Sequence, residues 1–176
     1  MSKTEHTNDL EPEDVVFPVK RSNGDSLEEK MTQNAYQNIL PARYLRQDEN
    51  GDIIETPEEL FERVANNVAL AELAYSDEAV TVTPDQIKGH HNDRNGAIAE
   101  VFGDSVAEGD DVTATLDDSN VKHFSYDSVV PELTDEALVD HVESVRDTFH
   151  DLLPIDFIPN SPSLMNAGAE LQQLSA

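Results

Sequence analysis

The stretch Arg43–Tyr75, RYLRQDENGDIIETPEELFERVANNVALAELAY, decides the fold of this chain. The dipeptide Asn50-Gly51 stands between two apolar pairs and predicts a tight reversal. A helix start follows, because the Thr56 hydroxyl can accept a hydrogen bond from the Glu59 amide while the Glu59 carboxylate reaches back to the Thr56 amide. Pro57 then occupies the first helical position, where its missing N–H costs nothing.

Apolar residues continue this helix at a helical spacing. Phe61, Val64, Ala65 and Val68 recur at i, i+3, i+4 and i+7 and predict one buried stripe. Upstream, residues 1–25 are polar and acidic and are interpreted as a flexible arm. Residues 26–75 are predicted to form a small helical domain, whose first, weaker helix ends at Pro41.

Residues 76–125 have a different character, with eleven acidic against three basic residues. Only Ile98–Phe102 suggests an ordered piece, so we expect an acidic insertion or a long linker here. Helical periodicity returns at Thr134, the expected N-cap, and Pro154 ends that helix. Its expected buried line is Leu138, Val142, Val145, Phe149 and Leu152. Residues 126–176 are therefore expected to hold this helix and a final loop or extended segment.

The charge of the chain is extreme. It has 37 Asp and Glu against 11 Lys and Arg, a formal net charge of −26, which opposes binding to nucleic acid or to anionic membranes. An acidic interaction tail would concentrate its charge in blocks. Here the acids are spread between periodic apolar positions, which favours a folded protein adapted to high salt, where the Debye length falls to about 3 Å at ~1 M salt.

Several function classes are excluded by what the sequence lacks. It has no cysteine, which removes disulfides, thiolate metal sites and thiol nucleophiles. No apolar run is long enough to span a membrane, and the first residues do not resemble a secretory signal, so a cytoplasmic location is expected. A metal site at His90-His91 and Asp93 would need a further ligand at a known spacing, and none is present. The sequence places His141 and His150 on a solvated helix face. No metal site is therefore predicted.

The segment NSPSLMNAG, Asn160–Gly168, carries the most specific chemistry. Ser161 and Ser163 offer hydroxyl donors beside a proline, while Asn166 and Gly168 permit unusual backbone angles that would turn amides toward an anion. This pattern suits a phosphate or a sugar. An ordinary loop leading into a buried strand explains it equally well.

Two quoted stretches together resemble a known family. RYLRQDENGDIIETPEELFERVA and FIPNSPSLMNAGAELQQLSA are similar to the N-terminal part of the large chain of ribonucleotide reductase, closest to the adenosylcobalamin-dependent (class II) enzymes. The resemblance implies a mainly α fold: the N-terminal helical domain, followed by the first loop and strand of a ten-stranded α/β barrel. The long 76–125 segment and the lack of an ATP-binding cone depart from that family's pattern.

The resemblance also implies site residues and partners. Ser163 falls on a substrate-binding position, and Ser175 and Ala176 fall on a second substrate-contacting stretch beside a redox-active cysteine. The catalytic cysteines are expected beyond Ala176, so no catalytic residue is predicted here. The complete enzyme would be a vitamin B12-dependent ribonucleoside-diphosphate reductase, with diphosphate or triphosphate as substrate left open. Its implied cofactor is adenosylcobalamin, and its implied partners are the remainder of the chain and, in a homodimer, a second copy.

Two further hypotheses concern the chain as a whole. A piece ending at Ala176 is expected to be inactive alone, and it is explained equally by a protein-splicing element inserted at the active-site motif or by a truncated gene. The rival function is a non-catalytic acidic helical adaptor or a relic of a truncated gene. The adaptor would bind a partner through the helices that begin near Thr56 and Thr134.

Overall fold

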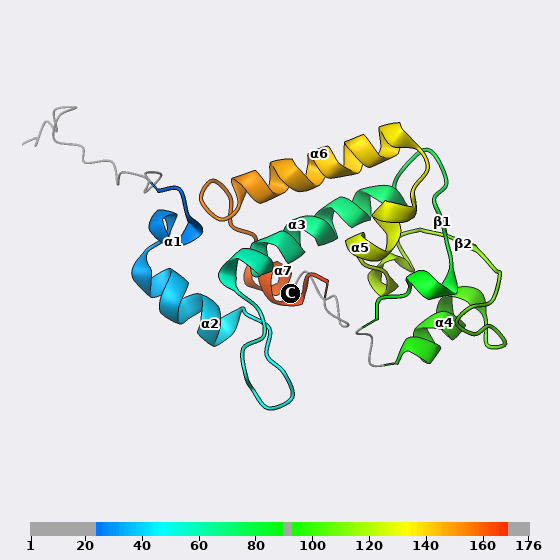
Figure 1. Cartoon of the computed structure of the whole chain (residues 1–176), viewed down its shortest axis with the longest axis horizontal. Coiled ribbons are helices and arrows are strands. Elements are labelled where there is room, and N and C mark those ends of the chain that lie inside the picture. Colours follow the sequence, from blue (N-terminus) through cyan, green and yellow to red (C-terminus); the bar gives the residue numbers. More distant parts are fainter. Residues whose placement is uncertain (1–23, 90–92, 169–176) are drawn as a thin grey trace, which may run out of the picture.

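Helix α3, Pro57–Ala74, runs through the centre of the molecule, with one long helix alongside it and most other elements around its two ends (Figure 1). The computed structural model describes residues 24–89 and 93–168. In chain order its elements are α1 (Leu27–Lys30), the π-helix η2 (Ala35–Ile39), α2 (Leu40–Arg43), α3, β1 (Thr81–Val82), η3 (Pro84–Gln86), α4 (Arg94–Phe102), β2 (Ala114–Thr115), η4 (Val121–His123), α5 (Tyr126–Val129), η5 (Val130–Glu132), α6 (Glu136–Leu152) and α7 (Ser161–Asn166). The predicted mainly α fold is confirmed.

The start of α3 is built as the sequence predicts. The Glu59 amide donates to Thr56 Oγ1 at 3.2 Å, and the Thr56 amide donates to Glu59 Oε2 at 2.7 Å, with Pro57 in the first turn. The reversal before it is also confirmed. Gln47 pairs with Ile53 in an antiparallel bridge, and Gly51, whose amide donates to the Asp48 carbonyl at 3.0 Å, follows the turn in a left-handed conformation with a φ of +87°.

The two halves of α3 belong to two separate apolar clusters. The N-terminal half contributes Leu60, Phe61 and Val64 to a cluster that also contains residues of α2, the following loop and the C-terminal region: Leu40, Leu45, Leu153, Leu164 and Ala167. The C-terminal half contributes Ala69, Leu70 and Leu73 to a second cluster. Val68, the last residue of the predicted stripe, is half-buried and lies in the sequence between the residues of the two clusters. One helix therefore joins both halves of the fold.

Helix α6 runs alongside α3 in the opposite direction (Figure 1). Its N-cap is Asp135, whose Oδ1 accepts from the amides of Ala137 and Leu138 at 2.9 and 3.2 Å, so the prediction that Thr134 caps this helix is wrong. The Asp135 side chain reaches the N2 and N3 amides directly. The helix ends at Leu152, shortly before Pro154, as predicted.

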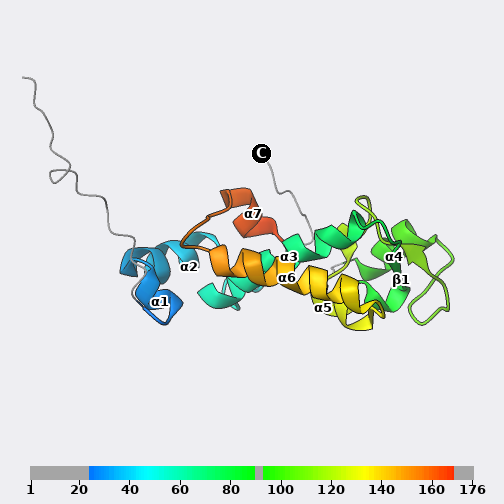
Figure 2. The ribbon, with the colours of Figure 1, turned by 90° about the horizontal axis from the view of Figure 1, so that it is seen from above.

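Only part of the line expected on α6 is buried. Val142 is fully buried, while Leu138, Val145 and Phe149 are half-buried and Leu152 is exposed. The cause is the position of α6 at the edge of the molecule, where it packs mainly against α3 along one narrow face. Figure 2 shows α6 along one side of α3, with α7 on another side.

Residues 76–125 differ from the expected acidic insertion or linker. They contribute buried apolar side chains to the second cluster: Val80, Val82, Ile87, Ala97, Ile98, Leu116 and Phe124. β1 pairs with β2 through Thr81–Thr115 and Val82–Ala114, and α4 contains the ordered piece expected at Ile98–Phe102. The described part of this stretch is therefore packed into the fold, although its apolar side chains are separated by acidic turns in the sequence and become one apolar surface only after folding. The domain boundaries themselves remain a prediction.

Two local predictions near the chain ends also need correction. Pro41 does not end the first helical region, since it lies in the first turn of α2, directly after the π-helix η2. A π-turn shifts the hydrogen-bond pattern at the point where proline has no N–H to donate. The final stretch was expected to be loop or extended chain, yet Ser161–Asn166 forms α7. Residues 1–23 of the expected arm lie outside the described residues.

None of the helices in the described ranges is both long enough and apolar enough to cross a lipid bilayer.

Candidate functional site

The segment singled out by the sequence, Asn160–Gly168, forms α7 and its two ends. Asn160 is the N-cap, and its Oδ1 accepts from the Ser163 amide at 3.2 Å and from the Ser163 hydroxyl at 2.6 Å. The hydroxyl of Ser161 lies 3.0 Å from the hydroxyl of Tyr44, in the loop after α2. The N-terminal end of α7 is thus held by its own cap and by one contact to the helical domain.

Arg63 of α3 holds the other end of α7. Its Nη1 donates to the Ala167 carbonyl at 2.6 Å, and its Nη2 donates to the Leu164 carbonyl at 3.3 Å. Carbonyls in the last turn of a helix lack partners within the helix, and a cation there also complements the helix dipole. Arg63 therefore satisfies two carbonyl groups that the short helix leaves open.

Glu55 fixes the orientation of Arg63. Arg63 Nε donates to Glu55 Oε1 at 2.6 Å and Nη2 donates to Oε2 at 3.0 Å, and the two side chains are only 10% and 7% exposed. Glu55 Oε2 also accepts from the Arg46 amide at 3.0 Å. Two-point pairing of a guanidinium with a carboxylate fixes both distance and angle.

Arg46 lies beside this pair. Burial lowers the pKa of its guanidinium, the nearby Arg63 charge lowers it further, and Glu55 opposes the shift. The group still stays protonated, because an arginine remains charged in proteins. Two cations therefore lie near one carboxylate, in a chain that is otherwise strongly acidic.

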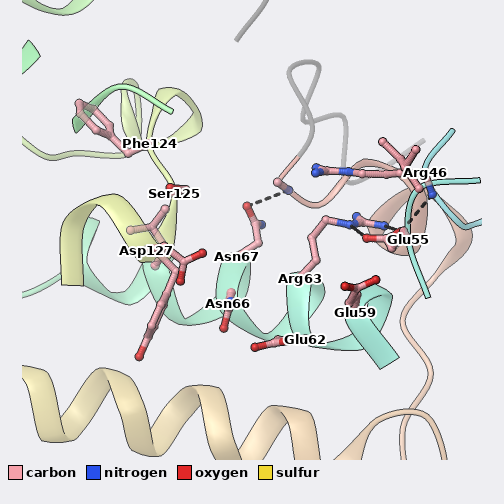
Figure 3. Close-up of a pocket in the computed structure, with 14 residues that line it drawn as sticks. Arg46, Glu55, Glu59, Glu62, Arg63, Asn66, Asn67, Phe124, Ser125 and Asp127 are labelled. Atoms are coloured by element: carbon pink, nitrogen blue, oxygen red, sulfur yellow. Dashed lines mark hydrogen bonds and ion pairs between the residues drawn. The ribbon is translucent and has the colours of Figure 1, made fainter. Parts of the chain in front are cut away.

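Asn67, one turn along α3 from Arg63, holds the residue after α7. Its Oδ1 accepts from the Gly168 amide at 3.1 Å. Gly168 has a φ of +69°, a left-handed conformation common just past a helix end. Figure 3 shows Arg63 and Asn67 on the side of α3 that faces Arg46, whereas Asn66 and Glu62 point toward α6.

Two cavities adjoin this arrangement. The one drawn in Figure 3 has a volume of about 380 Å³ and is lined by Arg46, Arg63 and Asn67 together with Asp127 of α5 and Ser125, the N-cap of that helix. The second has a volume of about 260 Å³. Its lining is mostly apolar and includes Val64, Phe149, Phe157, Asn160 and Ser163. Ser163 is thus placed at the wall of a cavity, next to its cap.

Of Asn166 and Gly168, the two residues expected to permit unusual backbone angles, Gly168 adopts one, while Asn166 has the ordinary conformation of the last residue of α7. The Ser163 amide donates to Asn160 and the Gly168 amide donates to Asn67, so the described backbone does not present them together to one anion. The hydroxyl of Ser163 is the remaining feature of the sequence prediction. Ser175 and Ala176, the other two predicted substrate residues, lie outside the described residues, and the structure does not test them.

The two histidines of α6 lie on its solvent-exposed face, as the sequence predicts. His141 is exposed on α6, 3.8 Å from Glu72, and His150 lies exposed in the last turn of α6. Asp93 caps α4 by accepting from the Gly96 amide at 2.8 Å, while His90 and His91 lie outside the described residues. Within residues 24–89 and 93–168, no three His, Asp or Glu side chains are grouped to hold a metal ion.

Sequence reasoning missed the residues that anchor α7. The sequence pattern places Glu55, Arg63 and Asn67 only in a helix and in the segment that leads into it. A signal was present, since Arg63 is the single basic residue of α3 and Asn66-Asn67 interrupt an apolar run. A charged or amide side chain inside a half-buried helix needs a partner, and that partner was more than one hundred residues away.

Comparison with known proteins agrees with this architecture. Residues 29–172 match the family model described as "Ribonucleotide reductase, all-alpha domain". The chain is 35% identical over 158 residues to the vitamin B12-dependent ribonucleoside-diphosphate reductase of Thermoplasma acidophilum. That match covers 84% of this chain and 18% of the relative. No solved structure matches.

The family match extends across both apolar clusters, from just after α1 begins to beyond α7, and so includes α3 and the anchored Ser163 segment. The chain spans less than a fifth of the length of its relative. On these findings, the chain belongs to the ribonucleotide reductase family and carries that family's all-alpha domain.

Proposed function

We propose that this chain is the N-terminal part of a vitamin B12-dependent ribonucleoside-diphosphate reductase and that it supplies one side of the substrate site. The observation that carries the proposal is the anchoring of α7. A six-residue helix bearing Ser163 is held at its C-terminal end by Arg63 and Asn67 of α3, at the wall of a cavity. Its relative of the same family is named as a reductase of ribonucleoside diphosphates.

The residues of this chain would bind and orient rather than reduce. Reduction of a ribose requires thiols, and the chain contains no cysteine. The Ser163 hydroxyl now donates to Asn160 Oδ1 at 2.6 Å. A substrate phosphate accepts but does not donate, so on binding the hydroxyl hydrogen would turn from Asn160 to the phosphate. Ser175 and Ala176 are proposed to add a second contact to the same substrate.

The cofactor of the complete enzyme is proposed to be adenosylcobalamin, which would supply the radical chemistry. The cavity beside Ser163, about 260 Å³, is smaller than the roughly 300–1,000 Å³ cavities that take drug-sized ligands. It does not fit a corrinoid, which is larger still. We therefore assign no residue of this chain to the cofactor, and the remainder of the reductase is the partner that would hold it.

Other parts of the proposal rest on charge and family. A net charge of −26 favours a protein adapted to high salt and opposes binding of nucleic acid or anionic membrane, and the cytoplasm is the proposed location. A homodimer of the complete chain is proposed as well. An adaptor using α3 finds no support among the described residues, because the apolar side chains of α3 are already buried against the rest of the chain.

The test is Ser163→Ala in the complete reductase, measured as the KM for the ribonucleotide. Loss of a hydrogen bond to a phosphate would cost roughly 1–3 kcal/mol, so the KM should rise by about 5- to 150-fold. Ser161→Ala is the matched control, since Ser161 lies in the same helix but its hydroxyl faces Tyr44. A KM that responds equally to both variants, or to neither, would remove Ser163 from the site.

A further inference from the structure

We propose that Arg63, oriented by Glu55, is a positioning residue for the substrate contact made by Ser163. This inference rests on the proposed function, because it takes Ser163 as the group that meets the substrate. Arg63 would act through the backbone of α7, by fixing the end of the helix on which Ser163 lies.

The first step of the argument is the length of α7. Isolated helices shorter than about 12–15 residues are marginal in water, and α7 has six residues. Its conformation therefore depends on contacts at its ends and on burial of Leu164 and Ala167 in the first apolar cluster. The Asn160 cap belongs to the same segment, so it shapes the first turn but does not fix that turn relative to α3.

The second step is the geometry of the guanidinium. One planar group donates to the carbonyls of Leu164 and Ala167 and to both oxygens of Glu55. These bonds fix the C-terminal turn of α7 relative to α3 in position and in rotation. The rigid fork of arginine makes this possible, whereas a lysine ammonium is a single point of charge on a flexible stem.

The third step is burial. The side chains of Arg63 and Glu55 are 10% and 7% exposed, so their interaction is little screened by solvent or by salt. An exposed ion pair would weaken in the high salt that this acidic chain favours, but a buried two-point pair would persist. The chain has 11 basic residues, and one of them occupies this position beneath the proposed substrate segment.

The last step connects Arg63 to Ser163. Leu164 follows Ser163 directly, and the Ser163 carbonyl accepts from the Ala167 amide at 3.1 Å. Arg63 thus holds the residue after Ser163 and the residue whose amide bonds to Ser163. Release of these carbonyls would let the helix shift, and a displacement of about 1 Å is enough to cost a binding or catalytic group much of its effect.

The experiment is a double-mutant cycle in the complete reductase. The variants are Arg63→Lys, Ser163→Ala and the two combined, with Arg146→Lys as control because Arg146 pairs with Asp147 on the surface of α6. We expect Arg63→Lys to raise the KM for the ribonucleotide by about fivefold or more, and the control to leave it unchanged. In the double variant the KM should match that of Ser163→Ala within about twofold, because both changes remove the same contact.

Each other outcome has a defined meaning. If the two KM effects multiply, Arg63 has only a structural role and the inference is overturned. If Ser163→Ala raises the KM but Arg63→Lys leaves it unchanged, the inference fails while the proposed function stands. If Ser163→Ala has no effect, the proposed role of Ser163 fails first.

A second variant guards against loss of folding. Glu55→Gln keeps the shape of the partner but removes the charge that orients Arg63. A folded Glu55→Gln enzyme should show the same rise in KM and the same lack of additivity with Ser163→Ala. An unchanged KM in that enzyme would also overturn the inference.

Discussion

Asn67 of α3 accepts a hydrogen bond of 3.1 Å from the backbone amide of Gly168, a residue 101 positions later in the chain. The bond fixes the chain just after the proposed substrate segment and holds Gly168 in a left-handed conformation. Helix α3 is therefore joined directly to the second stretch that resembles the family, and the following predictions test how this and other contacts maintain the fold.

Gly168→Ala should destabilise the chain. The φ of +69° would cost a residue with a Cβ about 1–2 kcal/mol. The new Cβ would make only ordinary van der Waals contacts, at 3.4 Å from Arg63 Cγ and 3.6 Å from Arg46 Nη2, so the backbone conformation is the source of the cost. Urea unfolding measures the loss. Gly89→Ala is the control, because nothing lies within 4 Å of its Cβ position, and equal losses would contradict the explanation.

Alanine substitutions should lower stability at the observed helix caps, including Asp135, but not at Thr134. Asp135→Ala and Thr56→Ala should each lower the free energy of unfolding by about 1 kcal/mol, since each side chain satisfies amides in a first helical turn. Thr134→Ala should stay within about 0.5 kcal/mol, because Thr134 is exposed and is not the cap. A large loss of unfolding free energy for Thr134→Ala, measured by urea unfolding, would show that Thr134 caps the helix after all.

Phe124→Ala should be among the most damaging core substitutions. Phe124 is 1% exposed in the second cluster, so its truncation should cost roughly 3–5 kcal/mol. Tyr75→Ala is the control, with a side chain 74% exposed and an expected effect within about 0.5 kcal/mol. Thermal unfolding distinguishes the two. A mild effect for Phe124→Ala would mean that residues 76–125 are the loosely attached linker predicted from the sequence.

Stability should depend on Glu100 in acid. The Lys122 ammonium at 2.7 Å and then His123 at 3.3 Å lower the pKa of the Glu100 carboxyl below its usual 4.5. A group with a lowered pKa stabilises the fold above its unfolded value, and this contribution disappears as the pH falls through the folded value. The effect is small, because Glu100 is largely solvent-exposed.

The measurement is urea unfolding of the parent chain and of Glu100→Gln between pH 7 and pH 3. The parent should lose more stability than Glu100→Gln as the pH falls below 4.5. Parallel curves for the two chains would show that the Glu100 contacts do not contribute.

Sodium chloride should stabilise the chain. With a net charge of −26, self-repulsion opposes the folded state, and added salt screens it as the Debye length shrinks from about 10 Å at 0.1 M to about 3 Å at 1 M. The free energy of unfolding should therefore rise with sodium chloride through this range. A potassium chloride series is the control for ion-specific effects. A flat or falling curve in both salts would contradict adaptation to high salt.

The sequence by itself determined the elements whose signals are local. The reversal at Asn50-Gly51, the capping box of Thr56 and Glu59 and the end of α6 near Pro154 each depend on residues a few positions apart. Such features follow from backbone geometry and hydrogen bonds within one turn, so they do not need the rest of the molecule.

Only the tertiary structure decided how these pieces serve one another. The apolar residues between 76 and 125 are separated by acidic turns and become a core only when they meet the C-terminal half of α3. Arg63 acquires its role because the chain brings Ala167 next to it, 104 positions away. The physical reason is the same in both cases: burial and hydrogen bonding depend on distance in space, which local sequence patterns do not encode.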